Sequence, residues 1–168
     1  HVGRLHPQKN HDFLIDVFAE LKKSKPDAEL ILVGTGPLEE KVKSKVVEKG
    51  LSDCVHFLGN RKDMNRIYQA MDVFVFPSLF EGLGIVAIEA QAAGVPIVCS
   101  EGLPPETDIT PIYRKLLLSD GAEKWANAAL EMAQNLKAHT NMQQYVIDAG
   151  FDMDATAKYM ESYYLNRW

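Results

Sequence analysis

A run of four consecutive apolar residues, 73–76 (VFVF), constrains the fold of this chain more than any other part of its sequence. A strand with one face in water alternates apolar and polar residues, whereas a strand covered on both faces is apolar throughout. Residues 30–33, 54–58 and 95–99 form further short runs that are largely apolar. Together these runs predict parallel strands with helices packed on both sides.

Segments with helical spacing lie between the runs. Phe13, Val17 and Leu21, for example, recur every four residues and predict a helix that ends near Pro26. Repeated strand-helix units with short turns predict an α/β fold, in which a doubly wound, Rossmann-like parallel sheet is built with right-handed crossovers. Ligands of such sheets bind outside the carboxyl ends of the strands.

The segment that follows residues 73–76 carries the clearest chemical signal. Glu81-Gly82-Leu83-Gly84 is a loop whose glycines let backbone N–H groups approach a ligand, and a helix is predicted from Ile85. The N-terminus of a helix at this place favours an anion such as phosphate. The carboxylates of Glu81 and Glu89 instead accept hydrogen bonds from hydroxyl groups. A sugar nucleotide offers both partners, since hydroxyl-rich rings flank its diphosphate.

Polar and glycine residues also follow the other strand ends. Arg4 and Lys9 come after a strand end at residues 2–3, where two cations can hold a diphosphate. The alternative is that both are solvated surface charges. The GTG turn at 34–36 is neither a Walker A loop nor a complete GxGxxG fingerprint, and by itself it favours a structural role. The residues at strand ends that can converge on one crevice are Gly3, Arg4, Lys9, Gly34, Gly36, Gly59, Asn60 and Arg61, together with the loop that starts at Glu81.

Composition limits the class of protein. The 168 residues suit one domain, and 18 Lys and Arg against 23 Asp and Glu give a net charge of −5. No broad basic surface for nucleic acid is expected from this balance. Cys54 and Cys99 are predicted to be inert thiols in a reducing cytoplasm. The sequence has no run of 18 apolar residues, which predicts no membrane span but leaves peripheral membrane contact open.

The chain resembles the C-terminal, donor-binding domain of the retaining GT-B glycosyltransferases, in the family called glycosyl transferases group 1. The resemblance rests on GRLHPQKN, LILVGTGP, VHFLGN and DVFVFPSLFEGLGIVAIEAQAAGVPIV. The last segment places Glu81 and Glu89 in an E-x7-E arrangement. One departure is the segment EGLPPE at 101–106, where the family carries a glycine pair before Pro and Glu. This puts a donor contact from that loop in doubt, although Glu106 can occupy the acidic position.

The resemblance implies a role for each matching residue. Arg4 and Lys9 would bind the donor diphosphate and stabilise it as a leaving group, with Glu81 on the hydroxyls of the transferred sugar and Glu89 on the ribose. Backbone groups of Gly82, Leu83, Gly84 and Ile85 would meet sugar and phosphate, and residues 59–61 would lie beside the nucleobase. Arg4, Lys9 and Glu81 are thus the expected catalytic group. Neither a metal nor another cofactor is expected.

The resemblance also implies a two-domain parent protein. Residues 1–150 are expected to be the donor-binding domain, which ends with a strand at about 115–118 and helices at about 122–136 and 141–149. Residues 151–168 are expected to form an aromatic helix of that domain that crosses to an N-terminal acceptor domain. The chain begins at His1 without Met, which suggests a fragment that is inactive alone. Aromatic residues of this last segment are Phe151, Tyr159, Tyr163, Tyr164 and Trp168.

The expected activity of the parent is sugar transfer with retention of configuration, from a UDP-linked donor to a glycan or lipid-linked acceptor. Its expected setting is polysaccharide assembly in the cytoplasm or at the inner face of the membrane. Two alternatives remain open from the sequence. One is a nucleotide-sugar-binding module without catalysis, and the other is a nucleotide-sugar hydrolase or epimerase on the same fold.

Overall fold

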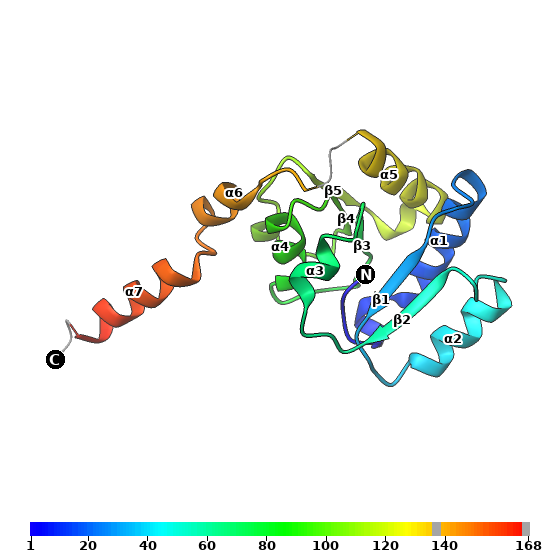
Figure 1. Cartoon of the computed structure of the whole chain (residues 1–168), viewed down its shortest axis with the longest axis horizontal. Helices are drawn as coiled ribbons and strands as arrows, with labels where there is room; N and C mark the ends of the chain where they lie inside the picture. The colour runs from blue at the N-terminus through cyan, green and yellow to red at the C-terminus, as the bar shows by residue number, and fades with distance from the viewer. Residues whose placement is uncertain (136–138, 166–168) are drawn as a thin grey trace.

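The strands of this chain form two parallel sheets that lie edge to edge on either side of the N-terminal segment (Figure 1). The computed structural model describes residues 1–135 and 139–165. One sheet pairs β1 (Leu30–Val33) with β2 (Val55–Gly59), and the other has the order β3-β4-β5. The strands of this second sheet are β3 (Phe74–Phe76), β4 (Ile97–Ser100) and β5 (Tyr113–Leu116).

Residues 1–3 connect the two sheets. Val2 forms a parallel bridge to Val33 of β1, and the Nδ1 atom of His1 lies 2.9 Å from the carbonyl oxygen of Val75 in β3. With this segment counted as a strand, the spatial order is β2, β1, residues 1–3, β3, β4, β5. This is the order of a doubly wound sheet, and its topological switch point lies between residues 1–3 and β3. The predicted fold class is confirmed.

Both faces of the sheets are covered, as the apolar run 73–76 predicts. Phe74 and Phe76 are fully buried on the face that packs against α3 and α4. Val75 points to the opposite face, where it packs with residues of α1 and α5. Side chains of α1 and α2 form a further core cluster with β1 and β2. The helices are α1 (His11–Ser24), α2 (Glu39–Glu48), α3 (Met64–Tyr68), α4 (Ile85–Ala92) and α5 (Ala122–Asn135), followed by α6 (Gln143–Asp148) and α7 (Met153–Leu165).

The last strand is two residues earlier than the sequence indicates. The prediction follows the apolar run at 116–118, but β5 spans Tyr113–Leu116 and pairs with β4 from Tyr113 opposite Ile97. Residues Leu118–Asp120 instead form a 3-10 turn. The position of β5 at the edge of its sheet explains the error, because an edge strand is only partly buried and needs no continuous apolar run.

The C-terminal helix makes few contacts with the rest of the chain. None of the residues of α7 is buried, and Figure 1 shows it extending away from the sheets. Tyr163 and Tyr164 are 37% and 60% exposed. Trp168, and Leu136 at the expected end of α5, lie outside the described residues. The expected crossing of this helix to another domain stays a prediction.

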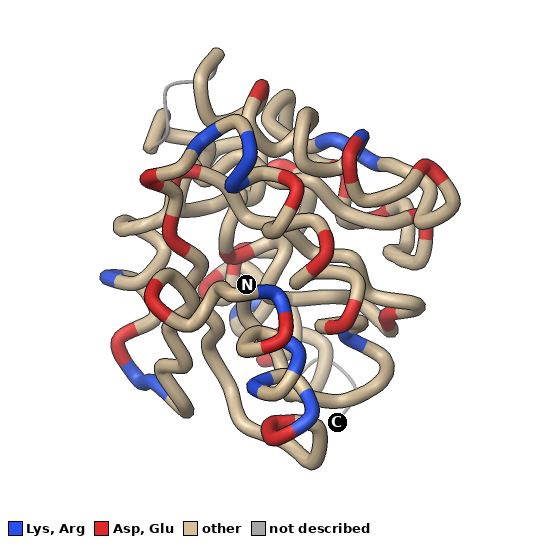
Figure 2. The backbone as a smooth tube through the Cα atoms, turned by 90° about the vertical axis from the view of Figure 1, so that its right-hand side faces the viewer, with Lys and Arg blue, Asp and Glu red and all other residues tan. Residues whose placement is uncertain are grey.

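Charges are mixed over the described backbone. Figure 2 shows acidic and basic positions interspersed along the tube. Within residues 1–135 and 139–165, no helix is both long and apolar enough to cross a membrane.

Candidate functional site

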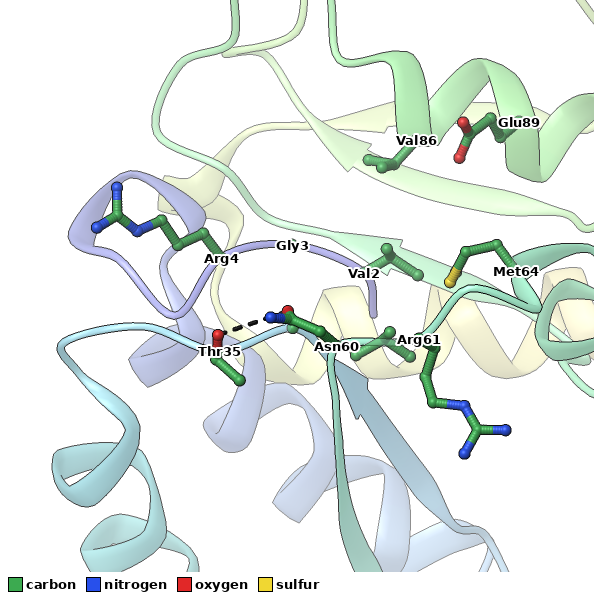
Figure 3. A pocket seen from close by; sticks show the side chains of 11 residues that line it. Val2, Gly3, Arg4, Thr35, Asn60, Arg61, Met64, Val86 and Glu89 are labelled. Atoms are coloured by element: carbon green, nitrogen blue, oxygen red, sulfur yellow. Dashed lines mark hydrogen bonds between the residues drawn. The ribbon is translucent and has the colours of Figure 1, made fainter.

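A cavity of about 550 Å³ lies at the carboxyl ends of the strands, beside the switch point. Figure 3 shows that residues from the N-terminal segment, the turns after β1 and β2, and α4 surround it. Six of the predicted donor-binding residues line this cavity: Gly3, Arg4, Gly34, Asn60, Arg61 and Glu89. Thr35, from the GTG turn at 34–36, also lines it. Sequence reasoning missed the remaining wall, which consists of Val2, Val33, Met64 and Val86.

The glycines at 34 and 36 shape this cavity by allowing two chain segments to touch. The backbone of the turn after β1 pairs with residues 3–5, with Gly3 N–H donating to Val33 O at 2.9 Å. Gly34 has φ +128°, and a β-carbon there would lie 2.2 Å from the carbonyl oxygen of Gly3. At Gly36, a β-carbon would lie 2.4 Å from the carbonyl oxygen of Leu5. Gly36 does not line the cavity, so the structure supports a packing role for it.

The expected anion site is the N-terminus of α4. Gly84 caps this helix in the left-handed conformation, with φ +70°, and has no side chain to satisfy the first-turn N–H groups. Those donors point toward the carboxyl ends of the strands. Gly82 lies in open space, and Leu83 and Ile85 are 37% and 60% exposed. The loop at 82–85 is therefore accessible to solvent, but it does not line the cavity, and its contact with a ligand stays a prediction.

Lys9 and Glu81 form an ion pair next to the cavity. Their Nζ and Oε1 atoms are 2.7 Å apart, and the two side chains are only 14% and 7% exposed. The Lys9 ammonium also lies 4.7 Å from the centre of the Phe76 ring. Gly3 makes room for this arrangement, because a β-carbon there would be 3.1 Å from Cε of Lys9. The sequence predicts that Lys9 binds the donor diphosphate, whereas in this structure its ammonium group pairs with Glu81.

Gln8 is a polar contact that sequence reasoning missed. Its side-chain amide donates to the carbonyl oxygen of Phe80 at 2.9 Å and to Oε2 of Glu81 at 3.4 Å. The backbone carbonyl oxygen of Gln8 accepts a hydrogen bond from Leu79 N–H at 2.8 Å. Lys9 and Gln8 thus each hold one oxygen of the Glu81 carboxylate. Proximity to Lys9 in the sequence was the only available signal for Gln8.

The two arginines of the cavity lie on opposite sides of it (Figure 3). Arg4 is exposed, and no ion pair is recorded for it within the described part of the chain. Arg61 donates from Nε and Nη2 to the carboxylate of Asp63, at 2.9 and 2.8 Å. This partner keeps the pKa of Asp63 below its usual value. Asn60 instead accepts from the Thr35 hydroxyl at 3.4 Å, so it connects the turns after β1 and β2.

Glu89 projects from α4 over the cavity (Figure 3). Its Oε2 atom accepts a hydrogen bond from the hydroxyl of Tyr68, at 2.8 Å. Sequence analysis did not single out Tyr68 as a site residue. Sequence spacing could not reveal this contact, because Tyr68 and Glu89 lie on different helices and are 21 residues apart in the chain.

The His11 side chain brings no positive charge to the site. His11 is buried, and burial lowers its pKa to about 4, with lesser contributions from the N-terminal amino group and Lys9. Its ring packs edge-on against that of His1, with centroids 4.8 Å apart. Across residues 1–135 and 139–165, no three His, Cys, Asp or Glu side chains come together as metal ligands.

The loop at 101–106 is held from several sides. Glu101 accepts a hydrogen bond from Leu118 N–H at 3.0 Å, and Gly102 O accepts one from Glu81 N–H at 2.9 Å. Glu106 is exposed in the 3-10 turn Pro105–Thr107 and is not among the residues of the cavity. A donor contact from Glu106 stays a prediction.

The comparison with known proteins agrees with this geometry. Residues 1–135 match the Glycosyl transferases group 1 family. The putative glycosyltransferase EpsF from Bacillus subtilis is 36% identical over 134 residues, which cover 79% of this chain and 35% of EpsF. The chain spans about a third of the length of the first curated relatives.

Two solved structures have the same fold. HepE from Anabaena, in complex with UDP, superposes with a TM-score of 0.78 at 23% identity, over 100% of this chain and 48% of HepE. The C-terminal domain of the group 1 protein LpcC from Francisella tularensis gives a TM-score of 0.70 at 20% identity, over 90% of this chain and 85% of that domain. The chain belongs to the Glycosyl transferases group 1 family, and its fold is that of the C-terminal, Rossmann-like domain of a GT-B glycosyltransferase.

Proposed function

We propose that this chain is the donor-binding half of a glycosyltransferase that transfers a sugar from a UDP-linked donor to a glycan or lipid-linked acceptor, with retention of configuration. The proposal places the reaction in the cytoplasm or at the inner face of the membrane. It requires an N-terminal domain to supply the acceptor site. Family membership supports transfer, and the UDP complex of HepE favours uridine as the base.

The observation that carries the proposal is the composition of the crevice at the switch point. Positive charge for a diphosphate comes from Arg4, which is exposed, and from the first turn of α4, of which Val86 lines the cavity. The Glu89 carboxylate projects over the same cavity and can accept from ribose hydroxyls. The cavity volume of about 550 Å³ lies within the roughly 300–1,000 Å³ of small-molecule sites.

In the proposed reaction, the main quantity to be stabilised is the negative charge on the departing diphosphate. Arg4, Lys9 and the N–H groups of α4 supply this electrostatic stabilisation without a metal. Lys9 must then be shared between the phosphate and Glu81, from which it is now 2.7 Å away. The acceptor hydroxyl loses its proton to the leaving phosphate on the same face of the sugar.

The geometry argues against Glu81 as a glycosidase-like nucleophile. Both of its oxygens already accept hydrogen bonds, from Lys9 and Gln8. A carboxylate that is paired with a cation is a weaker nucleophile, but it still has lone pairs for the hydroxyls of a sugar. Binding of the transferred sugar is therefore the role that we propose. A binding module without catalysis is the second candidate, because the cavity at Arg4 and Glu89 can hold a nucleotide without any acceptor.

Product analysis tests the proposed function. We expect the full-length parent to convert a UDP-sugar into a glycoside with the anomeric configuration of the donor, as read by NMR of the product. The isolated 168 residues should show no turnover, because the proposal assigns the acceptor site to another domain. Free sugar as the main product would support hydrolysis instead. An inverted glycoside, or turnover by the isolated chain, would contradict the proposal.

A further inference from the structure

We infer that Tyr68 is a positioning residue for the site, because its hydroxyl fixes the carboxylate of Glu89 in the orientation that receives the ribose of the nucleotide. The inference rests on the proposed function and adds a residue to its site. Tyr68 lies on α3 and Glu89 on α4, so the contact joins the two helices that cover the same face of the sheet.

The ring of Tyr68 is held firmly in the core. Only 3% of the residue is exposed, and the ring packs edge-on against Phe74 with centroids 6.3 Å apart. The hydroxyl is therefore held at one place, where it emerges beside α4. It lies 2.8 Å from Oε2 of Glu89 and 3.3 Å from the carbonyl oxygen of Val86. Tyr68 thus joins the rigid core to a side chain that is otherwise at the surface.

The hydroxyl has one hydrogen, and the carboxylate is the better acceptor. Burial, and then the charge of Glu89, raises the pKa of Tyr68, so the phenol stays protonated. A hydrogen bond to a charged acceptor at 2.8 Å is stronger than one to a carbonyl at 3.3 Å. The hydrogen therefore goes to Oε2, which leaves Oε1 for another donor. Within residues 1–135 and 139–165, Oε1 accepts no hydrogen bond.

An exposed glutamate on a helix otherwise samples several rotamers. Holding the carboxylate in place before the ligand arrives reduces the entropy that binding would cost. A fixed carboxylate that projects over the cavity can accept hydrogen bonds from the two neighbouring hydroxyls of ribose. Tyr68 is therefore expected to affect only ligands that carry those hydroxyls.

The test compares two probes on the wild type and on Tyr68→Phe. Calorimetric titration with UDP and with 2′,3′-dideoxy-UDP separates the contribution of the ribose hydroxyls to the affinity from that of all other contacts of the nucleotide. The substitution keeps the buried ring and removes one oxygen. Immobilising one side chain on binding costs about 0.5–1.5 kcal/mol of binding free energy. We therefore expect Tyr68→Phe to weaken the binding of UDP about three- to tenfold. Binding of the dideoxy probe should not change.

Tyr113→Phe is the matched control. It removes another partly buried hydroxyl, which contacts Thr107 at 2.9 Å and does not line the cavity. It should bind both probes like the wild type. Unchanged UDP binding by Tyr68→Phe, or an equal loss for both probes, would overturn the inference. If the wild type binds neither probe, both the proposed function and this inference fail. If the wild type binds UDP more tightly than the dideoxy probe, the proposed function stands, and the result for Tyr68→Phe then decides the inference alone.

Discussion

Gly34→Ala is expected to destabilise the chain by about 3 kcal/mol or more. The added β-carbon would lie 2.2 Å from the carbonyl oxygen of Gly3, and φ at this position is +128°. The oxygen in that collision belongs to the backbone, and the position of a β-carbon is fixed by its own backbone, so no flexible side chain can move away. Relief would require residues 3–5 to separate from the turn after β1, and their hydrogen bonds to Val33 and Thr35 would be lost.

Gly50→Ala separates this steric effect from the general cost of replacing a glycine. Gly50 also has a positive φ, +67°, but a β-carbon there meets nothing within 4 Å. Gly50→Ala should lower the free energy of unfolding by about 1 kcal/mol, from backbone strain alone. The free energies of unfolding would be measured by urea denaturation. Equal losses for the two variants would show that Gly3 and Gly34 are not in close contact.

The second large effect is expected at the ion pair next to the cavity. Lys9→Met removes the cation from a carboxylate that is 7% exposed, and we expect a loss of about 2–4 kcal/mol in the free energy of unfolding. Glu81→Gln should also destabilise, because it leaves the Lys9 ammonium beside the Phe76 ring without its anion. The double variant should be more stable than the sum of the two losses predicts, since neither charge then remains unpaired.

The partly exposed pair of Lys43 and Glu39 on α2 is the control for this cycle. Their side chains are 43% and 33% exposed, and they are four residues apart on one helix. Lys43→Met should leave the denaturation midpoint nearly unchanged, because solvent screens such pairs. Additive losses at Lys9 and Glu81 would contradict a direct pairing between them. Such a result would leave binding of the diphosphate as the only role assigned to Lys9.

The architecture was predictable because it depends on patterns that extend along the chain. The apolar run at 73–76 required a sheet covered on both sides, and Phe74, Val75 and Phe76 do point to opposite faces. Strand-helix alternation then left few topologies, and it placed the strand ends together. For this reason Gly3, Arg4, Gly34, Asn60, Arg61 and Glu89 could be assigned to one crevice, and they line one cavity.

Side-chain partners within the site were not predictable in the same way. Lys9 meets Glu81 across 72 residues, and Tyr68 meets Glu89 across 21, so no local spacing indicates either contact. Arg61 is near the expected place, but its guanidinium pairs with Asp63. These choices depend on tertiary packing and on charges brought close by folding. The roles assigned to Arg4, Lys9, Glu81 and Glu89 therefore stay predictions until a ligand is bound.

The central claim is that a nucleoside diphosphate binds the crevice between Arg4 and Glu89, and calorimetric titration with UDP tests it most directly. GDP and ADP, with the corresponding sugars, are titrated in parallel to identify the base. Arg4→Ala and Glu89→Ala should each weaken binding of the preferred nucleotide about tenfold or more, as expected for the loss of a charge-assisted contact. Arg114→Ala and Glu131→Ala, which disrupt a surface ion pair at β5 and α5, should bind like the wild type. Equal affinity of the wild type, Arg4→Ala and Glu89→Ala would contradict the assigned site.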